Sequence, residues 1–338
     1  MFEHVKDRSA LPAAANDTPD GKGYAWAFFG FPGNGAAGWN DPFRTGESGT
    51  ANAAIDIPGG HQIDVDGIYL NQSLTLGNYT IKSITGTRSS KEILASTYTS
   101  EAWTSLYDAS RNSKRDMFQQ EFRLVSELDG PFNFFSGASY FEDDVDLMVL
   151  ARLGMYEFFG AGTYYNSALD IQYTTQERES TAFYIDGTYE ISDQTSISAG
   201  FRRTSDEKDF HRLQYGTADN PLGSTIQLSE FKGPFTLPVP EANFGTNGRD
   251  SKKWNANTWR LLVEHNLNDD MMAYASASKG FVAGRFAETC GSITSCQLYE
   301  SEESQSMEIG LKGDFLDGSL RRCSRLIMTR SFAVTWCV

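Results

Sequence analysis

One glycine-rich motif has the spacing that can bind a dinucleotide. Gly33, Gly35 and Gly38 fit the pattern GxGxxG, which holds a pyrophosphate where a strand precedes it and a helix follows. The next residues, Trp39-Asn40-Asp41-Pro42, favour a turn rather than a helix. We therefore predict a flexible loop here and no bound cofactor.

Metal-ligand chemistry has little support in the sequence. The four histidines, at positions 4, 61, 211 and 265, lack ligand spacing. Two acidic clusters, residues 143–146 and 206–209, could bind cations at the bases of loops, but neither has the twelve-residue EF-hand pattern. A solvated loop explains both clusters without an ion, so we predict no metal site.

Motifs of covalent catalysis are absent from the sequence. We find no GxSxG nucleophile elbow, no HExxH and no Walker loop. Pairs of carboxylates are abundant, but the acidic composition alone accounts for them. We therefore expect a protein that is not an enzyme.

Charge and hydropathy exclude two broad classes of protein. With 29 Lys or Arg against 44 Asp or Glu, the formal net charge is −15, so nucleic-acid binding loses its usual electrostatic basis. The longest apolar run, Tyr24–Phe31, is far shorter than the ~20 residues of a membrane-spanning helix. The N-terminus lacks a signal-peptide core. Either the protein is cytoplasmic or this chain starts downstream of the natural start.

The pattern from residue 62 onward predicts an all-β protein. The chain repeats strand, tight turn, strand and long polar loop five times, with Gly, Asp or Asn in each turn. The predicted strand pairs are 62–75 with 79–88, 117–126 with 132–142, 181–191 with 195–206, 253–266 with 271–280, and 304–315 with a strand from about Ser319.

Two-residue periodicity gives several of these strands one apolar and one polar face. Phe183, Ile185 and Tyr189 alternate with the polar positions Asp186 and Glu190. The last hairpin alternates in the same way, since Met307, Ile309 and Leu311 lie between Glu308 and Lys312.

Connections at the two ends of the predicted strands differ in length. Turns at one end are short, whereas the polar loops at the other end span about 89–116, 143–180, 207–252 and 281–303. This asymmetry is typical of antiparallel transmembrane β-barrels with long extracellular loops. Cys290 and Cys296 lie in one such loop, where an oxidising environment favours a disulfide between them.

Ordered motifs along the second to fifth hairpins carry a family resemblance. They are Gln119–Leu124 (QQEFRL), Leu128–Phe132 (LDGPF), Gly137–Phe141 (GASYF), Thr181–Tyr184 (TAFY), Ser198–Arg202 (SAGFR), Asp206–Lys208 (DEK), Tyr274–Ser276 (YAS), Ser278–Phe281 (SKGF), Gly284–Phe286 (GRF) and Met307–Lys312 (MEIGLK). In this order they resemble TonB-dependent outer-membrane receptors of Gram-negative bacteria. The resemblance covers about residues 62–320.

The resemblance implies a partial barrel and three regions. Complete family members have an N-terminal plug domain, a TonB box and about 22 strands, whereas five hairpins are recognisable here. We expect an irregular, loop-rich segment over residues 1–61, a barrel fragment over 62–320, and an atypical tail over 321–338. Four Arg among residues 321–330 interrupt the alternation, so we expect no strand in the tail and consider a frameshift its origin.

The polar face of these strands is where the resemblance places cargo and plug contacts. The candidates that face the lumen are Asp186, Glu190, Arg202, Arg260, Glu264, Glu308 and Lys312. Salt bridges within the wall use the same residue types, so none is assigned to cargo.

The function that the resemblance implies is uptake of an iron chelate, vitamin or oligosaccharide across the outer membrane. Outer-membrane lipid and the TonB complex would be its partners, the latter through the missing plug and TonB box. The alternatives are a small passive outer-membrane channel and a secreted soluble β-rich binding protein. An outer-membrane hydrolase or a secreted lectin-like carbohydrate enzyme is the enzymatic alternative.

Overall fold

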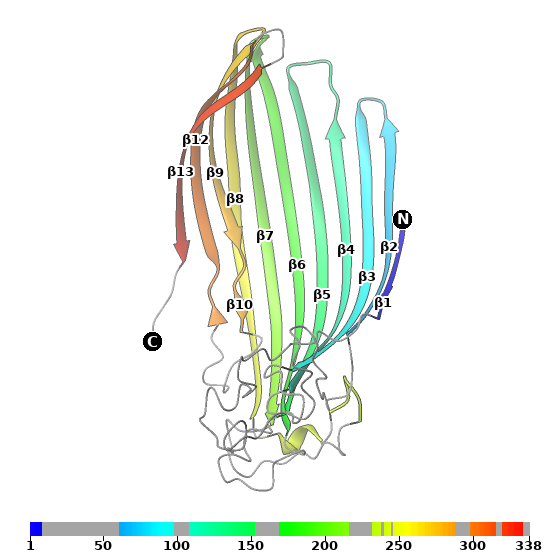
Figure 1. Ribbon diagram of the computed structural model, residues 1–338. Helices are drawn as coiled ribbons and strands as arrows, with labels where there is room; N and C mark the ends of the chain where they lie inside the picture. The colour runs from blue at the N-terminus through cyan, green and yellow to red at the C-terminus, as the bar shows by residue number, and fades with distance from the viewer. Residues whose placement is uncertain are drawn as a thin grey trace, which may run out of the picture.

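A single curved antiparallel sheet dominates the computed structural model (Figure 1). The structure describes residues 1–8, 61–97, 108–152, 169–215, 232–237, 240–244, 246–287, 298–315 and 320–333. Within them the sheet has eleven strands in the order β1-β2-β3-β4-β5-β6-β7-β8-β9-β12-β13. Every neighbouring pair is antiparallel. The first and last strands do not pair with each other, so the barrel is partial.

The strands lengthen toward the middle of the sheet. Their bounds are β1 Phe2–Asp7, β2 Gln62–Leu76, β3 Tyr79–Thr97, β4 Asp108–Ser126, β5 Phe132–Arg152, β6 Leu169–Ser192, β7 Thr195–Tyr215, β8 Thr246–Asn268, β9 Met271–Val282, β12 Glu302–Phe315 and β13 Leu320–Ala333. Two further strands, β10 (Arg285–Phe286) and β11 (Leu298–Tyr299), form a separate small sheet, and Glu241–Asn243 form a 3-10 turn. None of the described helices is long and apolar enough to span a membrane.

The predicted tight turns are confirmed wherever the structure describes them. Gly77 closes the β2–β3 hairpin with a φ of 59°, a conformation that glycine adopts at no steric cost. The other described turns, at residues 127–131, 193–194 and 269–270, fall at the predicted positions. The fifth turn, residues 316–319, lies outside the described residues.

Several predicted loop residues belong to strands instead. β5 runs to Arg152 and β7 to Tyr215, so the acidic clusters at 143–146 and 206–209 lie within β5 and β7. The expectation that they stand at loop bases is wrong. These strand ends extend beyond the apolar part of the sheet, where both faces can be polar. Their sequences therefore lack the alternation of apolar and polar residues that identifies a strand.

Both ends of the described chain hold strands where the sequence predicts an irregular or atypical segment. Phe2–Asp7 pairs with Gln62–Leu76, from Phe2 opposite Ile68 to Asp7 opposite Ile63, so the expectation of an irregular segment is wrong at its start. Residues 9–60, including the GxGxxG motif, lie outside the described part. Leu320–Ala333 pairs with β12 along its whole length. The predicted pairing of 304–315 with a strand from about Ser319 is confirmed, whereas the expectation of no strand in the tail is wrong. A frameshift as the origin of its sequence stays a prediction.

One face of the sheet carries an apolar band near the tight turns. In β6 the band contains Phe183, which is 68% exposed, with Ile185, Tyr189 and Ile191. Across the sheet, Phe201 stands opposite Ile185 and Trp259 opposite Phe201. In β5 the band covers residues 132–140, close to the about 9–11 residues that a tilted strand needs to cross a bilayer. We call this the outer face.

Beyond the apolar band, the outer face carries two rows of facing carboxylates. Glu142 stands opposite Glu179, and Glu179 opposite Glu207. The next row is Asp116, Asp144, Glu177 and Asp209 on β4 to β7. The change from apolar to acidic side chains sets the edge of the band that can face lipid.

The same face is covered by chain at the loop ends of the strands. Met148, Leu150, Ile171 and Leu213 form a buried cluster with Phe244. Lys91 and Lys114 both lie over the ring of Phe235, with their Nζ atoms 4.9 and 4.7 Å from its centroid. These contacts hold Phe235 and Phe244 against the sheet.

Candidate functional site

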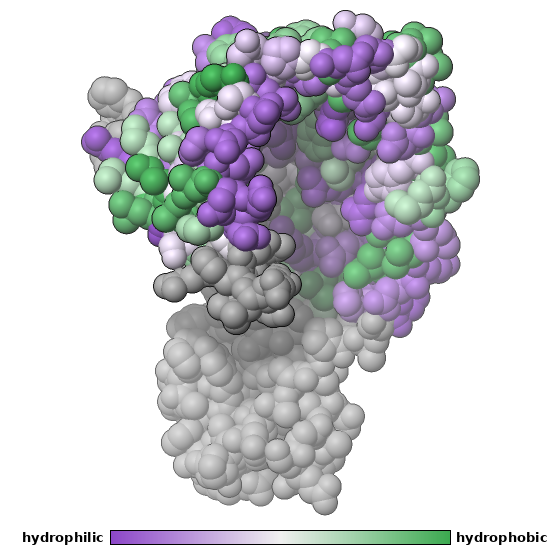
Figure 2. All heavy atoms as spheres, turned by 90° about the horizontal axis from the view of Figure 1, so that it is seen from above, coloured by the Kyte–Doolittle hydropathy of each residue, from purple (hydrophilic) through white to green (hydrophobic). Residues whose placement is uncertain are grey.

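The opposite, inner face gathers the polar side chains that the sequence predicted for a lumen. Seen from the end with the tight turns, the sheet curls round a hollow (Figure 2). The register puts Asp186 (β6), Gly200 (β7), Arg260 (β8) and Ser278 (β9) in one row. Arg202 lies in the next row, opposite Tyr184 and Thr258.

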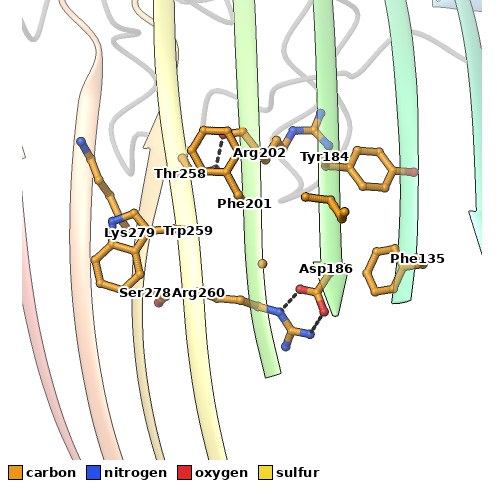
Figure 3. Close-up of a pocket in the computed structure, with 12 residues that line it drawn as sticks. Phe135, Tyr184, Asp186, Phe201, Arg202, Thr258, Trp259, Arg260, Ser278 and Lys279 are labelled. Atoms are coloured by element: carbon orange, nitrogen blue, oxygen red, sulfur yellow. Dashed lines mark hydrogen bonds and ion pairs between the residues drawn. The ribbon is translucent and has the colours of Figure 1, made fainter. Parts of the chain in front are cut away.

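A bidentate ion pair joins Asp186 to Arg260 across β7 (Figure 3). Arg260 donates from Nε to Oδ2 at 2.5 Å and from Nη2 to Oδ1 at 2.7 Å. The strand between them contributes Gly200, and a Cβ there would collide with the Asp186 carboxylate. The glycine therefore lets the two side chains meet over its backbone. Asp186 is only 8% exposed.

Two hollows flank this ion pair. The first, of about 250 Å³, is lined among others by Phe135, Tyr184, Asp186, Arg202 and Arg260. The second, of about 410 Å³, brings together four of the predicted residues with a tyrosine of β9 and an arginine of β13. These are Arg260, Glu264, Glu308, Lys312, Tyr274 and Arg325. Arg260 lies between the two hollows because it lines both.

In the second hollow a tyrosine and a glutamate are hydrogen-bonded. Tyr274 Oη donates to Glu308 Oε1, and the Nζ of Lys312 lies 4.8 Å from the centroid of the Tyr274 ring. The contact is a cation–π interaction. Tyr274 is opposite Gly310, which leaves room for the ring to lie against the wall.

Two predicted residues are placed differently from the rest. Glu190 is exposed beside the register shift that precedes Ser192 and lines neither hollow. Arg202 is exposed, donates from Nε to Thr204 Oγ1 at 3.2 Å, and lies over Tyr184 with its guanidinium carbon 5.6 Å from the ring centroid. Its contacts are therefore within the wall.

The structure contains a second tyrosine–carboxylate cluster on the inner face, whose members were not among the predicted inward residues. Tyr184 Oη donates to Glu121 Oε1, and Arg123 Nη2 donates to the same oxygen at 2.9 Å. Glu121 and Arg123 alternate with Phe122 in the QQEFRL motif. That two-residue alternation was the available signal that both face inward.

A belt of ion pairs crosses the inner face beyond the level of the apolar band. Arg115 Nε donates to Asp143 Oδ1 at 2.6 Å, and Arg178 Nη2 donates to Asp206 Oδ2 at 2.5 Å. Asp143 stands opposite Arg178. Lys208 follows on the same face of β7 and is 8% exposed. Its burial lowers the pKa of its ammonium group, as does the charge of Arg178.

Paired charges and phenols make up the chemistry of this face. Among the described residues no group of three or more His, Cys, Asp or Glu side chains could hold a metal ion. Cys323 is exposed with a free thiol, whereas the predicted disulfide candidates Cys290 and Cys296 lie outside the described residues. Paired charges and phenols along a curved wall suit polar contacts with material inside it.

The sequence matches the family described as TonB dependent receptor-like, beta-barrel, over residues 6–324. The chain belongs to this family. The family accounts for the alternation of an apolar outer and a polar inner face, and its members are outer-membrane proteins of Gram-negative bacteria. No curated protein matches the sequence.

Solved structures share the fold of this family member at low sequence identity. The ferric yersiniabactin uptake receptor FyuA of Yersinia pestis matches with a TM-score of 0.61 and 14% identity over 82% of this chain and 38% of its own. The siderophore receptor PiuA of Acinetobacter baumannii has a TM-score of 0.54 and 16% identity over 79% and 40%. The open form of the ferric-catecholate import receptor Fiu of E. coli has 0.54 and 14% over 98% and 49%. The chain thus spans less than half of each receptor.

Proposed function

We propose that this chain is part of the barrel wall of an outer-membrane receptor that imports a small-molecule cargo such as an iron chelate. The observation that carries the proposal is the two-faced register. Phe183 and Ile185 point to the apolar side, while Tyr184 and Asp186, which alternate with them, join polar clusters on the other side. Outer-membrane lipid would contact the first face, and a plug with its cargo the second.

Energy for import would come from TonB through a plug and TonB box elsewhere in the protein. Among the structurally similar proteins, FyuA is named as a ferric yersiniabactin uptake receptor, Fiu as a ferric-catecholate import receptor and PiuA as a siderophore receptor. Their names support iron chelates as the cargo class to examine first, ahead of vitamins and oligosaccharides.

Strand direction favours this proposal over a small channel that closes on its own. In a sheet of eleven antiparallel strands the two outermost, β1 and β13, run in the same direction. Joining them would create a parallel seam, whereas bacterial outer-membrane barrels are antiparallel with even strand numbers. Two copies in the same membrane orientation could not close an antiparallel barrel either, because β13 of one copy would run parallel to β1 of the next. Closure therefore needs an odd number of further strands.

Uptake in the producing bacterium tests the proposal. Cells that lack the gene should lose accumulation of radioactive iron supplied as one or a few chelates out of a panel. A strain without TonB should lose accumulation of the same chelates. Normal uptake of the whole panel, together with vitamins and oligosaccharides, in the deletion strain would refute a role in import.

A further inference from the structure

After β9 the chain leaves the main sheet and folds onto the inner face. β10 pairs with β11, Arg285 opposite Tyr299 and Phe286 opposite Leu298. We call residues 283–286 and 298–300 the strap. Its position is fixed by a buried cluster in which Phe286 packs with Phe210 and Trp254 of the wall.

Phe210 and Trp254 of the wall pack around the Phe286 ring of the strap, and we call the position of this ring the seat. The Phe286 ring stacks on Phe210 with the centroids 5.0 Å apart and 18° between the planes. Trp254 closes the other side with its centroid 6.4 Å from that of Phe286. The exposed fractions of Phe210, Trp254 and Phe286 are only 5–7%. Phe210 and Trp254 thus hold one phenyl ring out of water.

Next to this ring, the wall holds a buried ammonium group. Lys208 Nζ donates to the backbone oxygen of Gly284 at 2.5 Å and lies 5.6 Å from the centroid of the Trp254 ring. The nearby carboxylate of Asp206 already accepts two donors from Arg178. The acceptor that Lys208 itself contacts, the Gly284 carbonyl, is uncharged. An anionic acceptor in its place would add a charge–charge attraction to the hydrogen bond, and this attraction is stronger inside a protein than in water.

The fit at Gly284 is close. A Cβ there would overlap the Tyr299 carbonyl oxygen and would lie 2.5 Å from the Trp254 ring. At the far end, Glu300 accepts hydrogen bonds from Lys252 Nζ and Trp254 Nε1, both at 3.3 Å. β10 and β11 form a separate sheet and are not part of the eleven-stranded ladder, so the strap can leave without breaking the main sheet.

We propose that Phe210, Trp254 and Lys208 form a binding site for a small aryl anion, which the strap occupies until such a ligand displaces it. The strap presents a phenyl ring and, two residues earlier, an oxygen acceptor. A ligand that replaces it needs an aromatic ring for the seat and an oxygen for Lys208. A negative charge on that oxygen gives the ligand its advantage over the peptide carbonyl.

Benzoate is the simplest probe of this chemistry, and equilibrium dialysis of the full chain in detergent measures its binding. Binding should be lost in the Lys208→Met variant. It should persist in Lys253→Met, because Lys253 is an exposed neighbour that pairs with Glu207 on the outer face. Cyclohexanecarboxylate, which lacks the aromatic ring, and benzyl alcohol, which lacks the charge, should bind at least ten-fold more weakly.

Variants in which the strap no longer occupies the site distinguish a ligand-binding site from a purely structural cluster. Phe286→Ala empties the seat, so benzoate affinity should rise about ten-fold, because apparent affinity scales with the fraction of open site. Gly284→Ala displaces the strap by another route and should have the same effect. Circular dichroism of each variant checks that the sheet is intact.

The proposal is overturned if benzoate binds no tighter to either strap variant than to the parent, or equally well to Lys208→Met. The inference rests on the proposed function for one point only, namely that cargo meets the inner face of the sheet. Dialysis needs no transport, so loss of the import role would leave the binding result intact, and the reverse also holds.

Discussion

The ring of Tyr184 lies directly over Gly137 on the neighbouring strand. The two residues are opposite each other in the β5–β6 register, and a Cβ on Gly137 would lie 2.5 Å from the tyrosine Oη. Tyr274 and Gly310 repeat the arrangement between β9 and β12. In both places the glycine lets a large side chain lie flat, with its hydroxyl on a glutamate. The inner face stays clear for material inside the curve.

Gly137→Ala should therefore destabilise the sheet. The added methyl group would push Tyr184 away from Glu121, and overpacking of this kind costs about 1–3 kcal/mol. Denaturant unfolding in detergent micelles measures the change. Gly130→Ala is the matched control, because a Cβ at Gly130 would meet nothing within 4 Å. Equal stability of the two variants would contradict the role given to Gly137.

A double-mutant cycle on Asp186 and Arg260 should reveal strong coupling. The carboxylate is nearly buried while the arginine side chain is 48% exposed, so we expect a coupling energy of about 1–2 kcal/mol, below that of a fully buried pair. The exposed Lys253–Glu207 pair, with Nζ and Oε2 2.8 Å apart, should give about 0–0.5 kcal/mol. A coupling energy for Asp186–Arg260 no larger than this would show that the bidentate contact adds nothing.

The facing carboxylates beyond the apolar band predict a pH effect. Partial loss of hydration, and then the charges of Glu142 and Glu177, raise the pKa of Asp144 above its ordinary value. A carboxyl group with a raised pKa in the folded state destabilises that state when ionised. Its contribution to folding stability therefore increases as the pH falls through the raised pKa, and levels off below the unfolded value of about 3.9.

Asp144→Asn should remove this dependence and stabilise the protein near pH 7. We expect a few tenths of a kcal/mol, because the site is exposed and screened. Unfolding curves of the variant and the parent between pH 4 and pH 7 provide the comparison. A variant less stable than the parent at pH 7 would mean that Asp144 is favourably paired.

The ends of the strands predict an orientation in the membrane. Epitope tags in the connections 153–168 or 216–231 of a full-length protein should be labelled on intact cells. Tags at Asp193 or Asp269, in the tight turns, should be labelled only after the outer membrane is opened. The opposite pattern would invert the proposed topology.

The sequence was most informative where both periodicity and turn chemistry were strong. Phe183, Ile185 and Tyr189 revealed the outer face of β6, and Gly77 marked the turn between β2 and β3, because these signals are local. The outer rows through Glu177 and Glu179 resembled loop sequence, since a strand beyond the apolar band can be polar on both faces. The pairing of Phe2 with Ile68 crosses a long sequence separation that no local pattern encodes.

The site was only partly predictable for a similar reason. Alternation showed that Asp186 and Arg260 face the same side, but their contact depends on register across β7 and on Gly200 between them. Lys208 and part of the strap lie in the DEK and GRF motifs of the family resemblance, but no site was predicted there. A two-residue strand such as β10 leaves no periodic signal, and Lys208 stands among polar residues on both faces of β7.

Lipid contact along β6 decides whether the apolar face of this wall lies in the membrane. Single cysteines at Phe183, Tyr184, Ile185 and Thr188, in a full-length protein whose other cysteines are replaced by serine, would carry a fluorescent label in reconstituted membranes. A quencher attached to lipid acyl chains should strongly reduce emission at positions 183 and 185 and leave 184 and 188 nearly unchanged. Equal quenching at all four positions, or the reverse alternation, would contradict a barrel wall with its apolar face in the membrane.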